Sequence, residues 1–182
     1  KIIFSNWAFI IIGSISVIYW RIGNLIISKT LTPMDIANYE IAFKLFSISQ
    51  IIPVIISSTV FPILVKYYKN NDLDSFRKFY HNVFLVYLLF GFFTFTFIYS
   101  FADFILPFAF GDKYAGTTEP TKLMFLTILV FPTALLQANV LVAMKLEKLD
   151  MVLNVTSLVV NVILSLIGLT FYKSLAVINW SI

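Results

Sequence analysis

The hydrophobic pattern of the chain consists of long apolar runs separated by short polar segments. Five runs approach or exceed the roughly 20 apolar residues that a helix needs to cross a bilayer. We expect spanning helices over residues 2–28, 33–65, 80–101, 122–144 and 151–172, and the start of a sixth over residues 174–182. Runs of this length differ from the alternating segments of about ten residues that build a membrane β-barrel. The pattern predicts an all-α, polytopic transmembrane helical bundle.

Capping residues and prolines refine this pattern. Thr32, Pro33 and Asp35 supply an N-cap hydroxyl, a proline for the first turn and a first-turn acid, so a helix is expected to begin there. Asn70, Asn71 and Asp72 with Ser75 similarly start the third helix after a polar loop. Pro53, Pro62 and Pro132 fall inside apolar runs, and each removes a backbone donor. We expect them to bend their helices, which bundles of transporter helices tolerate.

The composition excludes most classes of soluble protein. The 182 residues are 60% hydrophobic and only 12% charged, and they include 20 Phe, more than the interior of a soluble fold of this size can hide. Cysteine is absent and His81 is the single histidine, so no thiolate or paired-histidine metal site is expected. The six glycines are scattered and form no phosphate-binding loop. We therefore expect no cofactor, no metal, no nucleic-acid partner and no chemistry on covalent bonds.

The basic residues are unevenly distributed between the two sides of the predicted bundle. One side carries Lys66, Lys69, Arg77, Lys78, Lys145 and Lys148, whereas the other carries Lys29, Lys113, Lys122 and Lys173. The richer side is expected to be cytoplasmic. The segment from Asp103 to Lys122 should then be an external loop, with residues 104–110 along the interface. The strongly aromatic third helix is expected to face lipid.

Polar residues within the first predicted helix suggest a site. Arg21 and Asn24 share one helical face with Ser14 and Ser28. A charge near the middle of a spanning helix costs roughly 2.5–3.5 kcal/mol on insertion scales, so it usually faces a cavity or a partner. Alternatively, the helix ends near Trp20 and Arg21 reaches the lipid headgroups.

The second and fifth predicted helices carry similar patterns. Lys44 and Gln50 lie along the second helix, where Lys44 either lines a cavity or pairs with Glu40 four residues earlier. Asn154 and Asn161 lie on the fifth helix with Ser157 and Ser165, at a spacing typical of a helix-packing seam or, alternatively, of substrate contacts. The candidate cavity residues are Arg21, Asn24, Lys44, Gln50, Asn154 and Asn161.

The order of several motifs resembles one transporter family. These motifs are Ala37-Asn38-Tyr39-Glu40-Ile41-Ala42-Phe43-Lys44-Leu45, then Ile52-Pro53, Phe61-Pro62 and Lys66-Tyr67-Tyr68, then Phe110-Gly111-Asp112-Lys113-Tyr114-Ala115, then Asn161-Val162-Ile163-Leu164-Ser165-Leu166, and finally residues 172–182. Their order over nearly the whole chain resembles that in polysaccharide and O-antigen flippases, a branch of the multidrug/oligosaccharidyl-lipid/polysaccharide exporter superfamily. The resemblance places the chain at helices seven to eleven of that family plus the start of the twelfth. Arg21 is followed by Asn24 where the family commonly has an Arg-x-Asp, so carboxylate-based ion coupling there is in doubt.

The resemblance implies a function and a larger protein. Residues 1–182 would form part of the C-terminal lobe of a two-lobe transporter whose first lobe is missing, and we expect both ends to be cuts in a longer chain. The implied substrate is an undecaprenyl-pyrophosphate-linked oligosaccharide, flipped across the bacterial cytoplasmic (inner) membrane for surface polysaccharide synthesis. Membrane lipids are the surrounding partners, and a coupling proton or sodium ion is left open.

Two other readings remain at this point. One is a cation-coupled multidrug exporter or a peptidoglycan-precursor flippase of the same superfamily. The other is a membrane polysaccharide polymerase or glycosyltransferase, for which the segment from Asp103 to Thr121 offers no convergent set of catalytic side chains.

Overall fold

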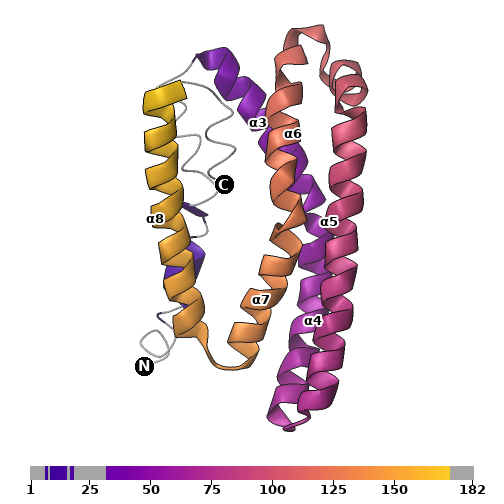
Figure 1. The fold of residues 1–182 in the computed structure, drawn as a ribbon, viewed down its shortest axis with the longest axis vertical. Coiled ribbons are helices and arrows are strands. Elements are labelled where there is room, and N and C mark those ends of the chain that lie inside the picture. The colour runs from indigo at the N-terminus through magenta and orange to yellow at the C-terminus, as the bar shows by residue number, and fades with distance from the viewer. Residues whose placement is uncertain (1–6, 8, 16, 19–31, 173–182) are drawn as a thin grey trace.

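The regular structure of the described residues is helical throughout. The computed structural model describes residues 7, 9–15, 17–18 and 32–172, and the first three of these stretches are helical. The remaining elements are α3 (Pro33–Ser49), α4 (Ile51–Lys69), α5 (Leu73–Phe110), the 3-10 helix η1 (Asp112–Thr117), α6 (Thr118–Met124), the 3-10 helix η2 (Phe125–Leu129), α7 (Phe131–Ala143) and α8 (Glu147–Tyr172) (Figure 1).

Four helical units are long and apolar enough to cross a membrane. They are Pro33–Lys69, Leu73–Phe110, Thr118–Ala143 and Glu147–Ile167. They coincide with the second to fifth predicted helices, so the prediction of an all-helical, multi-pass membrane protein is confirmed. Most of the first predicted helix and all of the sixth lie outside the described residues.

The helices extend further than their apolar runs because polar caps determine their ends. Thr32 and Asp35 form a capping box at the start of α3, as the sequence predicted. At the start of α5 the Asp72 carboxylate accepts a hydrogen bond from the Ser75 N–H at 3.1 Å, so the helix begins at the predicted polar segment, seven residues before the apolar run that starts at position 80. α5 ends at Gly111, whose φ of 81° is a conformation that glycine adopts easily.

The predicted external loop between Asp103 and Lys122 is wrong. α5 continues to Phe110, and η1 and α6 follow almost at once, so nearly the whole segment is helical. The expected interfacial segment at residues 104–110 is the last two turns of α5. The Lys122 Nζ atom lies 2.6 Å from an Asp103 carboxylate oxygen, so the two ends of the supposed loop are joined by an ion pair.

Charged residues mark the depth of the bilayer on each helical unit. Residues 45–65, 79–102, 123–144 and 151–172 contain no Asp, Glu, Lys or Arg. Each stretch holds about 20 to 24 residues, which corresponds to roughly 30 to 36 Å of helix. This length matches the roughly 30 Å hydrocarbon core of a bilayer. Because the Asp103–Lys122 ion pair joins the ends of two such stretches, α5 and α6 enter the membrane at the same level.

The described helices pack around two separate apolar clusters. The first contains Tyr39, Phe46 and Phe125, with Ala42, Met124 and Ile128, and joins α3, α6 and η2. The second contains Leu64, Tyr87 and Leu136, with Val60 and Ala143, and joins α4, α5 and α7. α5 runs alongside both clusters (Figure 1). The bundle is therefore divided into two packed halves along its length.

α5 faces lipid on one side and packs against other helices on the opposite side, whereas the sequence predicted only the lipid contact. Phe93, Phe104 and Phe108 are 65%, 72% and 85% exposed, which a bilayer rather than water must cover. On the opposite side Tyr87 and Gly91 are buried against the neighbouring helices. The aromatic composition indicated the lipid contact but not this packed side.

Two of the spanning units are interrupted between the clusters. α3 and α4 meet at Gln50, and α6 is separated from α7 by the 3-10 turn η2. Pro132, in the first turn of α7, has no N–H to donate to the Ile128 carbonyl four residues earlier. The backbone of α5 approaches this carbonyl closely at Gly91, where an added Cβ would lie 2.6 Å from the Ile128 oxygen. The interruption of the α6–α7 unit and Gly91 of α5 therefore lie together at the Ile128 carbonyl.

Candidate functional site

Of the two predicted cationic site residues, the structure describes Lys44 but not Arg21. Arg21 and Asn24 lie outside the described residues, so their predicted role stays a prediction. Lys44 is exposed at the end of the uncharged stretch 45–65, near the edge of the hydrocarbon core. The predicted Glu40–Lys44 ion pair does not form between these two described side chains.

Gln50 occupies the interruption between α3 and α4. Its backbone N–H bonds to the Phe46 and Ile48 carbonyls, and its side chain makes no cap on α4. The side-chain Nε2 atom is buried and has no hydrogen-bond acceptor among the described residues. Gln50 lies five residues inside the uncharged stretch 45–65, so this donor is within the hydrocarbon depth. A buried donor without an acceptor costs about 1–3 kcal/mol, which makes Gln50 the predicted residue most in need of a partner.

The polar residues of α8 fall into two groups: Asn154 has hydrogen-bond partners on its own helix, and Asn161 and Ser165 are buried. The Asn154 amide donates to the Asp150 carbonyl at 2.8 Å and to its carboxylate at 3.2 Å. Asn161 and Ser165 are 2% and 1% exposed, whereas Ser157 is exposed. The buried pair agrees with the predicted packing seam. Sequence reasoning missed Asp150, although its spacing of four from Asn154 could have suggested the contact.

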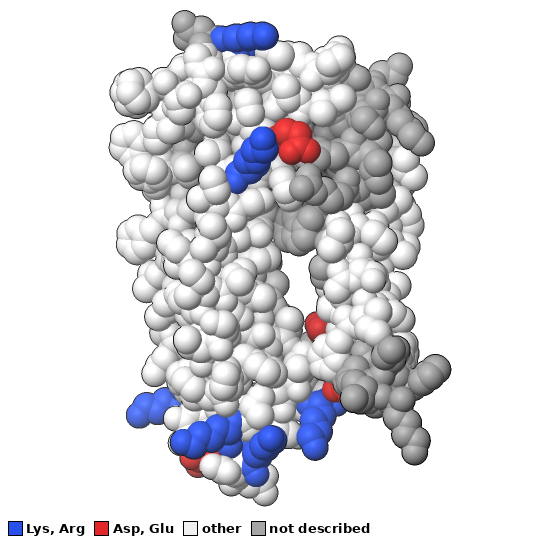
Figure 2. Space-filling view, turned by 180° about the vertical axis from the view of Figure 1, so that it is seen from behind, with Lys and Arg blue, Asp and Glu red and all other residues white. Residues whose placement is uncertain are grey.

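The predicted residues do not converge at one point. α8 stands apart from α4 and α5, and α7 crosses from its lower end toward the centre of the molecule (Figure 1). Seen from behind, the surface is hollowed at mid-height beside α8 (Figure 2). Gln50 belongs to the α3–α4 unit, and Asn154 and Asn161 belong to α8. The described candidate residues therefore occupy two helical units, with the buried Gln50 amide on one and the α8 amides on the other.

A second set of polar residues ties three helices together and was not singled out from the sequence. The Tyr87 hydroxyl of α5 donates to the Pro53 carbonyl of α4 at 2.9 Å, and it is fully buried. The Asn139 amide of α7 donates to the Ser57 hydroxyl of α4. These contacts hold α4, α5 and α7 as one body, because polar groups within a membrane favour partners over lipid. Their separations in sequence of 34 and 82 residues gave no local signal.

A similar buried contact joins α3 to η1. The Thr117 hydroxyl donates to the Asn38 side-chain oxygen at 2.9 Å, and both residues are buried. An added Cβ at Gly116 would lie 3.0 Å from the Asn38 amide nitrogen, so the glycine allows the close approach. This contact joins the sequence motif at residues 37–45 to the residues that directly follow the motif at 110–115.

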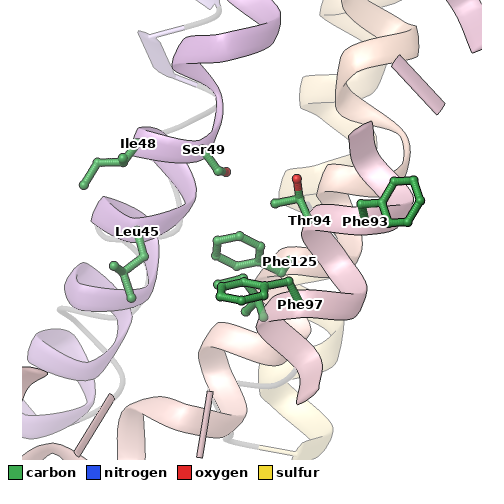
Figure 3. Close-up of a pocket in the computed structure, with 8 residues that line it drawn as sticks. Leu45, Ile48, Ser49, Phe93, Thr94, Phe97 and Phe125 are labelled. Carbon is green, nitrogen blue, oxygen red and sulfur yellow. The ribbon is translucent and has the colours of Figure 1, made fainter. Parts of the chain in front are cut away.

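An apolar groove of about 440 Å³ opens between α3, α5 and η2 (Figure 3). Ser49 and Thr94 point toward each other from its two sides, and the Ser49 hydroxyl donates to the Phe46 carbonyl at 2.6 Å. The groove is lined by Leu45, Ile48, Ser49, Phe93, Thr94, Phe97, Ile98 and Phe125. Since none of these is charged, the groove suits a hydrocarbon chain and not a phosphate.

Comparison with known proteins gives one match. A family model described as polysaccharide biosynthesis protein matches residues 2–119, well over half of the chain. No curated protein and no solved structure gives a significant match. Within the part of the chain that the structure describes, no group of three or more His, Cys, Asp or Glu residues could hold a metal ion.

Proposed function

The chain belongs to the polysaccharide biosynthesis protein family, and from this premise we propose that it is part of a flippase for lipid-linked oligosaccharides. Its substrate would be an oligosaccharide on undecaprenyl pyrophosphate, moved from the inner to the outer leaflet of a bacterial cytoplasmic membrane for the synthesis of O-antigen or capsule. The process would be transport and not chemistry on covalent bonds. The four described membrane-spanning units support the membrane part of this proposal.

The interruption at Gln50 is the observation that carries the proposal. Transporters commonly build substrate sites from discontinuous helices near the middle of the membrane, because irregular backbone is tolerated only where protein or a cavity satisfies it. The junction of α3 and α4 lies within the hydrocarbon depth and presents a buried amide donor that has no acceptor among the described residues. A sugar hydroxyl or a phosphate oxygen is an acceptor of the required kind.

Cationic side chains would stabilise the pyrophosphate. A pyrophosphate cannot enter hydrocarbon unshielded, and charge-assisted hydrogen bonds from Arg or Lys offset the cost of removing it from water. Arg21 and Lys44 are the proposed partners, while the amides of Asn24, Gln50 and Asn154 are proposed contacts of the sugar. The route would pass between this lobe and the first lobe of the same protein.

The two packed halves suggest how access alternates. The cluster around Phe46 and the cluster around Leu136 are separate, and α3–α4 and α6–α7 are both interrupted between them. Rocking of the two lobes, with adjustment at these interruptions, would open the site to one surface and then to the other. A coupling proton or sodium ion remains part of the proposal without an assigned residue.

The proposal is tested with Gln50→Leu in the complete protein, in cells whose surface polysaccharide depends on it. We expect surface polysaccharide to fall at least several-fold at unchanged protein level, because the amide is lost and the volume is kept. Ser58→Ala is the matched control, since this hydroxyl is exposed and bonds to the Ile55 carbonyl of its own helix at 2.7 Å. Normal export by Gln50→Leu would remove Gln50 from the mechanism.

Arg21→Ala tests the electrostatic part of the proposal in the same assay. Unchanged glycan export at a normal protein level would remove Arg21 from the mechanism. Accumulation of a cationic dye separates the flippase from a drug exporter, because a glycan flippase should not protect cells from the dye.

A further inference from the structure

One end of the described bundle carries six exposed cations. They come from α4, α5, the segment between α7 and α8, and the first turn of α8, and we call them the basic collar: Lys66, Lys69, Arg77, Lys78, Lys145 and Lys148. Figure 2 shows Lys and Arg gathered at this lower end. None of the six forms an ion pair with an acid in the described parts of the chain. At the other end, by contrast, Lys122 is bound to Asp103.

The four acids near the basic collar, Asp72, Asp74, Glu147 and Asp150, are fewer than its six cations and form no ion pair with them in the described parts of the chain. The Asp72 carboxylate caps α5 through the Ser75 N–H. Asp150 is 6% exposed and accepts its hydrogen bond from Asn154. The cations of the collar are therefore open to ligands that the protein itself does not supply.

The depth of the collar identifies the ligand. Lys66, Lys78 and Lys145 directly follow or precede the uncharged stretches 45–65, 79–102 and 123–144, and the other three cations lie within three residues of these. At about 1.5 Å per residue, all six lie within roughly 6 Å of the hydrocarbon edge. The headgroup layer on each side of a bilayer is about 5–8 Å thick. The collar therefore lies at the level of the lipid phosphates.

The collar is also held in shape. Tyr67 and Phe79 contact through their rings at 6.0 Å, and Tyr68 and Phe76 do so at 6.4 Å. These pairs join the end of α4 to the start of α5 and so fix the two lysines of α4 beside Arg77 and Lys78. A preformed cluster loses less side-chain freedom when it binds a ligand than separate flexible residues would.

We propose that the basic collar is a binding surface for anionic phospholipids of the leaflet at that end. Phosphatidylglycerol is the proposed ligand of the collar, because its phosphate lies at the level of these cations and the lipid carries a net negative charge. The lipids would hold the α4–α5 hairpin against the membrane surface. The proposal requires only a membrane-embedded protein, so it stands or falls separately from the transport function.

The test uses the full-length protein in nanodiscs of phosphatidylcholine containing about a third phosphatidylglycerol. The lipids that remain bound after mild detergent extraction are counted by native mass spectrometry. The double variant Arg77→Gln/Lys78→Gln removes two charges of the collar. The matched control, Lys113→Gln/Lys122→Gln, removes two lysines at the other end. Arg77→Lys keeps the charge and controls for folding.

We expect the unaltered protein to retain phosphatidylglycerol preferentially. Each charge near an anionic surface contributes roughly a fivefold preference for the anionic lipid. The preference of the collar variant for phosphatidylglycerol over phosphatidylcholine should therefore fall several-fold to about twentyfold. The control pair and Arg77→Lys should keep the preference, and high salt should weaken it. Equal losses in both double variants, or no loss in the collar variant, would overturn the proposal. Retention of an added polyprenyl pyrophosphate without any preference for phosphatidylglycerol would overturn it too.

Discussion

The contact between α5 and η2 leads to a quantitative prediction for Gly91→Ala. An added Cβ would lie 2.6 Å from the Ile128 carbonyl oxygen and 3.2 Å from the Leu129 Cα atom, whereas ordinary contact begins at 3.4 Å. α5 must therefore move away by about 0.8 Å, the difference between 3.4 and 2.6 Å. The obstacle is backbone, so no side-chain rotation relieves it.

The expected cost follows from this displacement. A gap of 0.5–1 Å loses about a quarter to a half of each dispersion contact across an interface, and overpacking of a well-packed core typically costs about 1–3 kcal/mol. Up to about 1 kcal/mol of this cost is offset, because alanine has a higher helix propensity than glycine. We expect Gly91→Ala to lower the free energy of unfolding by about 1–2 kcal/mol.

Gly13→Ala is the matched control, because Gly13 is also helical and nothing lies within 4 Å of its added Cβ. Both variants gain the same helix propensity, so the difference between them isolates the packing cost of about 1–3 kcal/mol. The free energy of unfolding is measured by SDS titration of the purified full-length protein in mixed micelles. Equal stability of the two variants would refute the close approach of α5 to η2.

Two buried hydrogen bonds give further predictions. Thr117→Val leaves the Asn38 oxygen without its donor, so it should lower the free energy of unfolding by about 1–3 kcal/mol in the same titration. Thr156→Val is the control: it loses only a bond to its own helix and should lower that free energy by under about 1 kcal/mol. Tyr87→Phe removes the 2.9 Å bond to the Pro53 carbonyl and should cost about 0.6–1.7 kcal/mol, as interhelical bonds in membranes do, and a neutral effect would show that this bond does not hold α4 to α5.

The membrane spans were predictable because the bilayer imposes a simple local rule. A chain in lipid must satisfy every backbone group internally, so an apolar run of about 20 residues becomes a helix. The second to fifth predicted helices all appear as spanning units, and the N-cap at Thr32 was also foreseen. The polar start of α5 at Asp72 was foreseen as well, whereas its end at Phe110 was missed, because the helix continues beyond its apolar run.

The candidate site was predictable only in part. Spacing along one helix identified Gln50 and the buried Asn161, since both depend on helical periodicity. It left open whether Lys44 pairs with Glu40, because an i, i+4 spacing allows an ion pair without requiring one. The contact of Asn38 with Thr117 was missed, since it joins residues 79 positions apart.

The sequence by itself determined that this protein is a bundle of membrane helices, at what depth its charges lie, and which family it resembles. These properties depend on hydrophobicity and on the order of residues along one chain. The tertiary structure alone decided that Gly91 meets the Ile128 carbonyl, that Tyr87 joins α5 to α4, and that the Gln50 amide is buried without an acceptor among the described residues. Helix rotation and packing set these contacts, and they depend on which faces of distant segments meet.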